Sequence, residues 1–145
     1  MKKYEFVEGD TIEHKGVTLK RIKALFDFCQ VKAGDLGGYI ESKKNLDNYG
    51  NAWVYDNAWV SDNAIVSDNA KVSDNAIVCG NAWVYGNARV YGNAKVSDNA
   101  IVCGNAMVYG NAWVSDNAIV YGNAMVYGNA IVCGNARVYG NACGI

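Results

Sequence analysis

Apolar and polar positions alternate along this chain with a period of six residues, from Asn51 to the C-terminus. Asn recurs every sixth residue, Ala always follows it, and Val occupies the position two beyond Ala as far as Val138. In an extended strand, residues two apart point to the same side and the residue between them points to the other side. The pattern therefore predicts a short strand and a bend in each of sixteen consecutive hexads.

The constant positions of the hexad indicate which side faces the interior. Ala and Val fit a cavity of constant cross-section, whereas the residue between them varies among Trp, Ile, Met, Lys, Arg and Cys. We therefore expect Ala and Val to face inward and the variable residue to face outward. The three residues after Val are rich in Asn, Asp and Gly, which tolerate positive φ and make local side-chain hydrogen bonds, so they suit a sharp bend. No proline interrupts a parallel ladder.

Residues 1–48 have a different composition and hold eight of the fourteen acidic and nine of the thirteen basic residues. Alternating apolar residues and turn signals predict the following local elements. These are strands at Tyr4–Val7 and Val17–Ile22, a hairpin turn at His14–Gly16, a helical turn at Ala24–Phe28 and a tight loop at Gly34–Gly38. A solenoid exposes unpaired strand groups at its ends, so residues 1–48 are interpreted as a capping segment and 49–145 as the repeat domain.

A degenerate first hexad is expected at residues 45–50. This segment keeps the Asn, Tyr and Gly of a hexad but places Leu46 at the Ala position and Asn48 at the Val position.

The phrase Val-Tyr-Gly-Asn-Ala-Lys, with Val90 as its aliphatic and Ala94 as its small residue, resembles the hexapeptide repeat of left-handed parallel β-helices. The resemblance covers residues 49–145 and implies an all-β fold with a left-handed coil, three hexads per coil and about five coils in total. The segment VKAGDLGGYIES, which begins at Val31, also resembles the N-terminal part of uncharacterised hexapeptide-repeat proteins of bacteria and their phages.

With three hexads per coil, residues eighteen apart stack in columns, and twelve of the sixteen outward residues are apolar. A continuous apolar stripe of this kind usually marks an interface. We therefore predict an interface for self-association or a protein partner, with its longest unbroken run on the third face. Its residues are Ile65, Trp83, Ile101 and Ile119 on the third face, Trp59, Ile77, Trp113 and Ile131 on the second, and Ile145 at the C-terminal end. The alternative is that Trp and Ile merely favour strands and stack on one another.

Charge and cysteine content narrow the functional classes. The net charge of −1 argues against a nucleic-acid partner, and no segment is apolar enough for a signal peptide or a membrane span, so a cytoplasmic location is expected. The five cysteines are odd in number and form no CxxC pair, which favours reduced thiols over disulfides or a zinc site. Neighbouring aspartates such as Asp98 and Asp116 supply too few ligands for a specific cation site.

The best-known members of the hexapeptide-repeat family are acyltransferases with a catalytic histidine and a loop inserted between coils. The only histidine here, His14, lies outside the array, and no insertion interrupts the hexads. We therefore expect no catalysis, no cofactor and no metal, and a non-catalytic interaction or scaffold module of a kind that phages could encode. The alternative reading is an acyltransferase-like enzyme that uses an acyl-CoA donor. Stacked tyrosines such as Tyr91 and Tyr109 are expected to stabilise the coils rather than bind a ligand.

Overall fold

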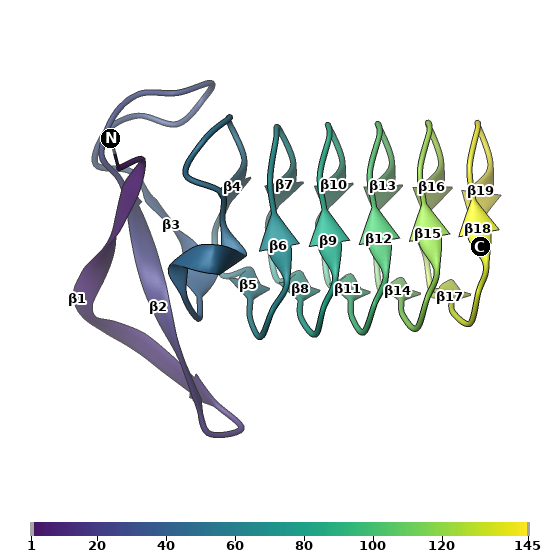
Figure 1. Cartoon of the computed structure of the whole chain (residues 1–145), viewed down its shortest axis with the longest axis horizontal. Coiled ribbons are helices and arrows are strands. Elements are labelled where there is room, and N and C mark those ends of the chain that lie inside the picture. The colour runs from purple at the N-terminus through teal and green to yellow at the C-terminus, as the bar shows by residue number, and fades with distance from the viewer. Residues whose placement is uncertain (1, 145) are drawn as a thin grey trace.

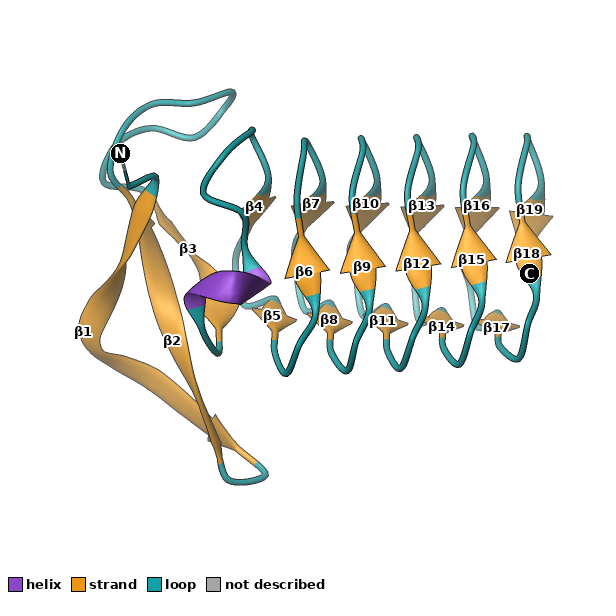
Figure 2. Cartoon of the chain, in the orientation of Figure 1, coloured by secondary structure: helices purple, strands orange, loops and turns teal. Residues whose placement is uncertain are grey.

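The computed structural model describes residues 2–144, and the side chains of residues 2–143. The fold of these residues is all-β, with three longer strands near the N-terminus, one short 3-10 helix and an array of two-residue strands (Figures 1 and 2). The longer strands are β1 (Tyr4–His14), β2 (Val17–Ala24) and β3 (Leu36–Ile40), and the helix is η1 (Lys43–Asn45). The array consists of β4 (Trp53–Val54), β5 (Trp59–Val60), β6 (Ile65–Val66), β7 (Lys71–Val72), β8 (Ile77–Val78), β9 (Trp83–Val84), β10 (Arg89–Val90), β11 (Lys95–Val96), β12 (Ile101–Val102), β13 (Met107–Val108), β14 (Trp113–Val114), β15 (Ile119–Val120), β16 (Met125–Val126), β17 (Ile131–Val132), β18 (Arg137–Val138) and β19 (Cys143–Gly144).

The array is a parallel β-solenoid with three sheets. The first face is β4-β7-β10-β13-β16-β19, the second is β5-β8-β11-β14-β17, and the third is β6-β9-β12-β15-β18. Each strand pairs with the strand eighteen residues further on, as Arg89 does with Met107, so three hexads form one coil as predicted. The course of the chain in Figure 1 is compatible with the left-handed winding that the resemblance implied.

The solenoid core is made of the constant Ala and Val residues. Every Ala and Val of the array from Ala52 to Val126 is fully buried, so the predicted inward and outward assignment is confirmed. Burying one Val side chain contributes about 1.5 to 3 kcal/mol, and the fifteen stacked Val residues therefore build a sufficient core. Burial falls in the last described coil, where Ala136 is exposed and Val138 half-buried, because no further coil of the described residues covers them.

The corners use Asn differently from what the sequence suggested. The positive φ lies one residue before each Asn, at an Asp such as Asp68 (φ 59°) or a Gly such as Gly104 (φ 66°). The Asn side chains bond between coils rather than locally, as when the Asn81 amide donates to the Asn99 side-chain oxygen at 3.2 Å. An amide both donates and accepts, so identical Asn residues can form an indefinite ladder. The repeat therefore requires Asn because it stacks on itself.

The N-terminal segment begins with the predicted hairpin. Strands β1 and β2 pair antiparallel around a turn at Lys15 and Gly16, which have positive φ. The predicted helical turn at Ala24–Phe28 is wrong, because Ala24 ends β2 and a bend at Leu25 and Phe26 leads into an isolated bridge between Phe28 and Val31.

Strand β3 joins the hairpin to the solenoid. The predicted loop at Gly34–Gly38 is a turn only at its start, and Leu36–Ile40 forms β3. This strand pairs antiparallel with β2 and parallel with β5, which places Ile40 opposite Val60. A Cβ atom at Gly38 would lie 2.5 Å from the Ala58 carbonyl oxygen, so only glycine allows this close approach.

The degenerate hexad has a register different from the predicted one. Leu46, rather than Asn48, bridges Val66 in parallel and is fully buried, so Leu46 occupies the Val position. The hydrophobic side chain decides the register, since a polar Asn in the core would need buried hydrogen-bond partners. With Ile40 and Leu46 supplying two sides of an initial coil, the parallel stack has about six coils.

Candidate functional site

The third face presents the most continuous apolar surface of the array. Its column runs Ile65, Trp83, Ile101 and Ile119 in register before it ends at Arg137. The three isoleucines are half-buried by their neighbours in the stack, whereas 48% of the Trp83 surface is exposed. The structure therefore places these four predicted interface residues in one column.

The predicted residues of the second face also share one column, which is covered at its N-terminal end. The His14 ring at the hairpin tip contacts the Trp59 ring at a centroid distance of 4.5 Å. Lys95 interrupts the apolar column and places its ammonium group 5.5 Å from the centre of the Trp113 ring. Trp113 and Ile131 are 51% and 66% exposed. The hairpin thus covers the end of this face nearest the N-terminus and leaves the distal part open.

Not every outward position of the array is exposed. Trp53 points outward from its coil but is buried, because the rings of Tyr4 and Phe28 pack on it at 6.2 and 5.3 Å. Ile145, the predicted contact at the C-terminal end, lies outside the described residues.

The hairpin and the second face enclose a cavity of about 170 Å³ that sequence reasoning missed. Its lining residues are His14, Lys15, Val17, Leu19, Trp59, Ser61, Asp62, Ile77, Cys79 and Lys95. The sequence contained no signal for this cavity, because the hairpin residues lie more than forty positions from the array residues that they meet. No insertion interrupts the hexads, and the wall of this cavity is supplied by the N-terminal hairpin instead.

The polar groups of the hairpin cavity are a mixed set. His14, Lys15 and Lys95 face it together with the Asp62 carboxylate, which accepts the Gly80 N–H at 3.0 Å. Burial raises the pKa of the Cys79 thiol, and the opposing effect of Lys95 is smaller, so this thiol is a weak nucleophile at neutral pH. The cavity can therefore hold a small polar or apolar molecule.

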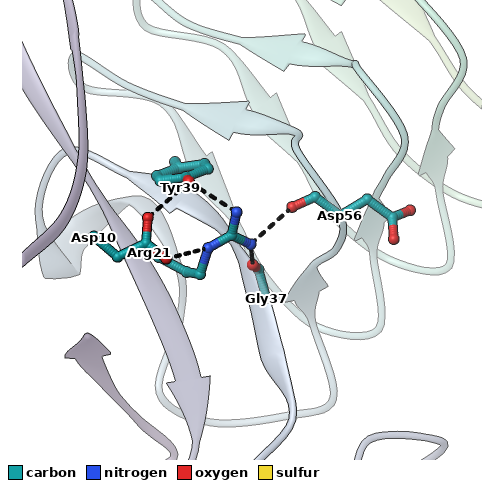
Figure 3. Close-up of polar contacts among 5 residues, drawn as sticks. All are labelled: Asp10, Arg21, Gly37, Tyr39 and Asp56. Atoms are coloured by element: carbon teal, nitrogen blue, oxygen red, sulfur yellow. Dashed lines mark hydrogen bonds and ion pairs between the residues drawn. The ribbon is translucent and has the colours of Figure 1, made fainter.

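A polar network holds the hairpin against the solenoid (Figure 3). Arg21 lies at its centre and donates to the Asp10 carboxylate at 2.8 Å, to the Tyr39 hydroxyl at 2.7 Å and to the Gly37 carbonyl at 2.6 Å. Tyr39 in turn donates to Asp10 at 2.9 Å. A further donation from Arg21 to the Asp56 carbonyl at 3.3 Å reaches the first corner of the array. The network therefore fixes the angle at which the hairpin leaves the second face.

Within residues 2–144, no group of three or more His, Cys, Asp or Glu side chains is close enough to hold a metal ion. The corner aspartates instead accept backbone N–H groups from the next coil, as Asp98 does from Asp116 at 3.1 Å. The same part of the chain contains no helix of the length and hydrophobicity that a membrane span requires.

Comparison with known proteins supports the repeat architecture. Residues 70–86, 82–96, 102–116 and 118–134 match the family model described as YdcK Beta solenoid repeat. These segments together cover less than half of the 145 residues. No curated protein matches the chain. The matched repeats and the three parallel sheets together identify the chain as a repeat β-solenoid protein with a scaffold-like architecture.

Proposed function

We propose that this β-solenoid is a non-catalytic interaction module that associates with a second copy of itself through its third face. The observation that supports this proposal is the unbroken apolar column from Ile65 to Ile119, in which Trp83 is 48% exposed. Stacked rungs lie about 4.8 Å apart, so the column forms a continuous stripe rather than scattered residues.

The other two faces are less suited to this role. The second face is partly covered by the hairpin and carries Lys95 in its centre. The first face carries Lys71 and Arg89 on neighbouring rungs, and its Trp53 is buried by the capping segment. Burial of charged side chains without partners is costly, so an apolar interface favours the third face.

The cellular setting of the module belongs to the same proposal. A cytoplasmic location is proposed from the odd number and the spacing of the five cysteines, which favour reduced thiols. The relation to bacterial and phage hexapeptide-repeat proteins rests on the VKAGDLGGYIES segment and on the Asn-Ala hexads.

Sedimentation equilibrium at micromolar concentration tests the proposed self-association. The wild-type chain is expected to sediment above its monomer mass of 15.7 kDa, and Ile101→Lys is expected to reduce the mass to that of the monomer. Met107→Lys supplies the matched control, because Met107 has the same place in the hexad on the first face. A monomeric wild-type chain, or equal effects of the two substitutions, would contradict the proposal.

Acyl transfer is a second candidate, favoured by the cavity that the only histidine of the sequence helps to line. A general base must lie within hydrogen-bond reach of its substrate, and a substrate bound in this cavity would lie next to His14. Acetyl-CoA binding to the wild-type chain, measured by calorimetry and lost in His14→Asn, would favour this enzyme over the interaction module.

A further inference from the structure

A column of tyrosines with one missing member lies along the corner that follows the first face. The corner residues of successive coils are Tyr55, Ser73, Tyr91, Tyr109 and Tyr127. The Tyr91 and Tyr109 rings stack at 4.9 Å with an interplanar angle of 3°, and those of Tyr109 and Tyr127 stack at 5.5 Å with 14°. Ser73 therefore replaces a ring at the one position between Tyr55 and Tyr91.

The missing ring leaves a groove of about 530 Å³. Its lining residues are Gln30, Tyr55, Asp56, Lys71, Ser73, Asp74, Arg89 and Tyr91. Tyr55 and Tyr91 are two rungs apart, a separation of roughly 10 Å for backbones that stack about 4.8 Å per rung. One planar ring at the level of Ser73 would thus continue the existing stack at the spacing that the other tyrosines already show.

Two cations lie next to this gap without an anionic partner. Lys71 and Arg89 are directly paired across β7 and β10, so their side chains project from neighbouring rungs of the same face. Neither forms an ion pair or a side-chain hydrogen bond within the described residues. Like charges at directly paired positions of a sheet repel each other, and an anion between them would remove that repulsion.

A second groove of about 370 Å³ continues from the same two cations toward the capping segment. It is lined by Cys29, Asn51, Asn69, Lys71, Asn87 and Arg89. The asparagines here belong to one amide ladder, in which Asn51 donates to Asn69 at 3.2 Å and Asn69 to Asn87 at 3.2 Å. Lys71 and Arg89 therefore form the border between the two grooves, with a neutral polar surface on the side away from the tyrosines.

The opposite border of the tyrosine groove is acidic. Asp56 accepts the backbone N–H of Asp74 at 3.2 Å, and Asp74 accepts that of Gly92 at 3.0 Å. Figure 3 shows that the Asp56 carboxylate points away from Arg21, and the hydrogen bond from Arg21 to Asp56 is to the backbone carbonyl. The groove thus has carboxylates on one side and cations on the other. This polarity suits a ligand with N–H donors on its ring and negative charge on a separate group.

From this arrangement we propose that the groove binds a small planar aromatic phosphate, of the mononucleotide class. Its ring occupies the Ser73 rung between Tyr55 and Tyr91, and its phosphate lies between Lys71 and Arg89. Amino groups on the base face Asp56 and Asp74. Aromatic side chains accept bases by stacking without strong sequence preference, and Arg and Lys are the usual partners of phosphate.

The protonation of the two tyrosines agrees with this assignment. A tyrosine hydroxyl is neutral at pH 7 at its ordinary pKa, and burial raises the pKa of Tyr55 and of Tyr91 further, so neither hydroxyl repels a phosphate. Because the groove lies on the first face and the proposed self-association surface on the third, either proposal can fail without the other.

Calorimetric titration of the full chain with AMP tests the proposal. The wild-type chain is expected to bind one AMP saturably, and Ser73→Tyr, which fills the gap with the chain's own ring, is expected to weaken binding at least tenfold. Ser97→Tyr places the same side chain at a corner column without tyrosines and should leave binding unchanged. Thermal unfolding of both variants verifies that each is folded. Absence of AMP binding by the wild type at millimolar concentration, or equal binding by Ser73→Tyr, would overturn the proposal.

The two halves of the ligand are tested separately with adenosine and inorganic phosphate. Adenosine is expected to bind more weakly than AMP and to lose binding in Ser73→Tyr. The paired change Lys71→Gln and Arg89→Gln is expected to reduce AMP binding to the level of adenosine and to remove its dependence on salt. If adenosine binds as tightly as AMP, or the glutamine variant binds AMP normally, the phosphate does not lie between Lys71 and Arg89 and the assignment is wrong.

Discussion

The array and the capping segment differ in how they supply hydrogen-bond partners to the backbone groups of a coil. Within the array, each coil satisfies the next coil with identical groups, as when the Ile101 N–H donates to the Ala118 carbonyl at 3.0 Å. At the N-terminal end no preceding array strand is available, so the backbone of β3 donates to the β5 side of the first coil and individual side chains supply further donors. The Lys3 ammonium donates to the Ala52 carbonyl at 2.8 Å, and the Asn45 amide donates to the Ala64 carbonyl at 2.8 Å. In the interior of the array, neighbouring coils therefore satisfy each other's backbone groups, whereas the first coil needs donors from the non-repeating capping segment.

The two regions also differ in how far they expose the outward-pointing residue of the hexad to solvent. Trp53 and Trp113 both point outward, but Trp53 is 1% exposed beneath Tyr4 and Phe28 while Trp113 is 51% exposed. The position in the repeat sets the direction of a side chain, and the capping segment decides whether that side chain meets solvent.

The largest expected loss of stability is for substitution of Trp53, with Trp113 as the comparison. Trp53→Ala should lower the free energy of unfolding by about 3 to 5 kcal/mol, because it removes the aromatic contact between the capping segment and the solenoid. Trp113→Ala is the matched control and should cost less than about 1.5 kcal/mol, most of it from the lost contact with Lys95. Chemical denaturation of both variants measures the difference. Equal losses would show that the capping segment does not depend on Trp53.

A smaller effect is expected where coils approach each other closely within the array. A Cβ atom at Gly104 would lie 2.9 Å from the backbone nitrogen of Gly122, and the residue has a φ of 66°. Gly104→Ala should therefore cost about 2 to 4 kcal/mol, since it adds overpacking to the penalty of positive φ. Gly134→Ala has nearly the same φ, 64°, but nothing within 4 Å, and should pay only the backbone penalty of about 1 kcal/mol. Similar losses in denaturation experiments would contradict close packing at the corner.

The capping lysine should make stability depend on pH. Burial lowers the pKa of Lys3 from 10.5 to about 8, and Asp47 offsets this only in part. A lysine with a lowered folded pKa binds fewer protons in the folded than in the unfolded chain above that pKa, so stability rises with pH. The free energy of unfolding should increase by about 2 kcal/mol between pH 8 and 9.5.

The matched control for this pH effect is Lys3→Met, which removes the titrating amine. Burial raises the pKa of Tyr4 to about 12, so Tyr4 opposes the trend only above pH 10, where the unfolded chain ionises first. The difference between wild type and Lys3→Met cancels the other groups that titrate in this range. A pH-independent difference would show that Lys3 is solvated in the folded chain.

The smallest effect is expected in the exposed amide ladder. Asn99 accepts from Asn81 at 3.2 Å and donates to Asn117 at 3.3 Å. Asn99→Ala breaks both bonds and should cost about 1 kcal/mol. The Asn57 side chain makes no such bond within the described residues, so Asn57→Ala should cost less. Thermal unfolding can rank the two variants, and an equal shift in Tm would mean that the ladder does not contribute to stability.

The regular part of the fold could be predicted because its evidence is local and repeated sixteen times. The inward Ala and Val followed from the period of six, the three columns followed from the resemblance to hexapeptide-repeat β-helices, and the hairpin around Lys15 and Gly16 followed from turn composition. The register of Leu46 was predicted wrongly, because a single imperfect hexad gives no periodicity against which to align it. Strand β3 was read as a loop since its glycines, chosen for close backbone approach, also signal turns.

In the candidate sites, too, the repeated features could be predicted and the contacts made by the non-repeating segment could not. The stacking of Ile65, Trp83, Ile101 and Ile119, and that of the tyrosine column, could be predicted from the hexad spacing together with the three hexads per coil that the family resemblance implied. The contact of His14 with Trp59 could not, because it joins a unique hairpin to the array across more than forty residues.

The sequence by itself determined the repeating strand-and-bend units and the residues that line the interior, because every hexad places Ala and Val on the same side of its strand. The three faces followed from the resemblance to hexapeptide-repeat β-helices. Only the tertiary structure decided which outward residues are covered and where cavities lie. Those features arise where the non-repeating segment meets the array, as at Trp53 and His14, or where one side chain is smaller than its neighbours in the stack, as at Ser73. The geometry of such contacts depends on the relative position of distant segments, which local periodicity does not encode.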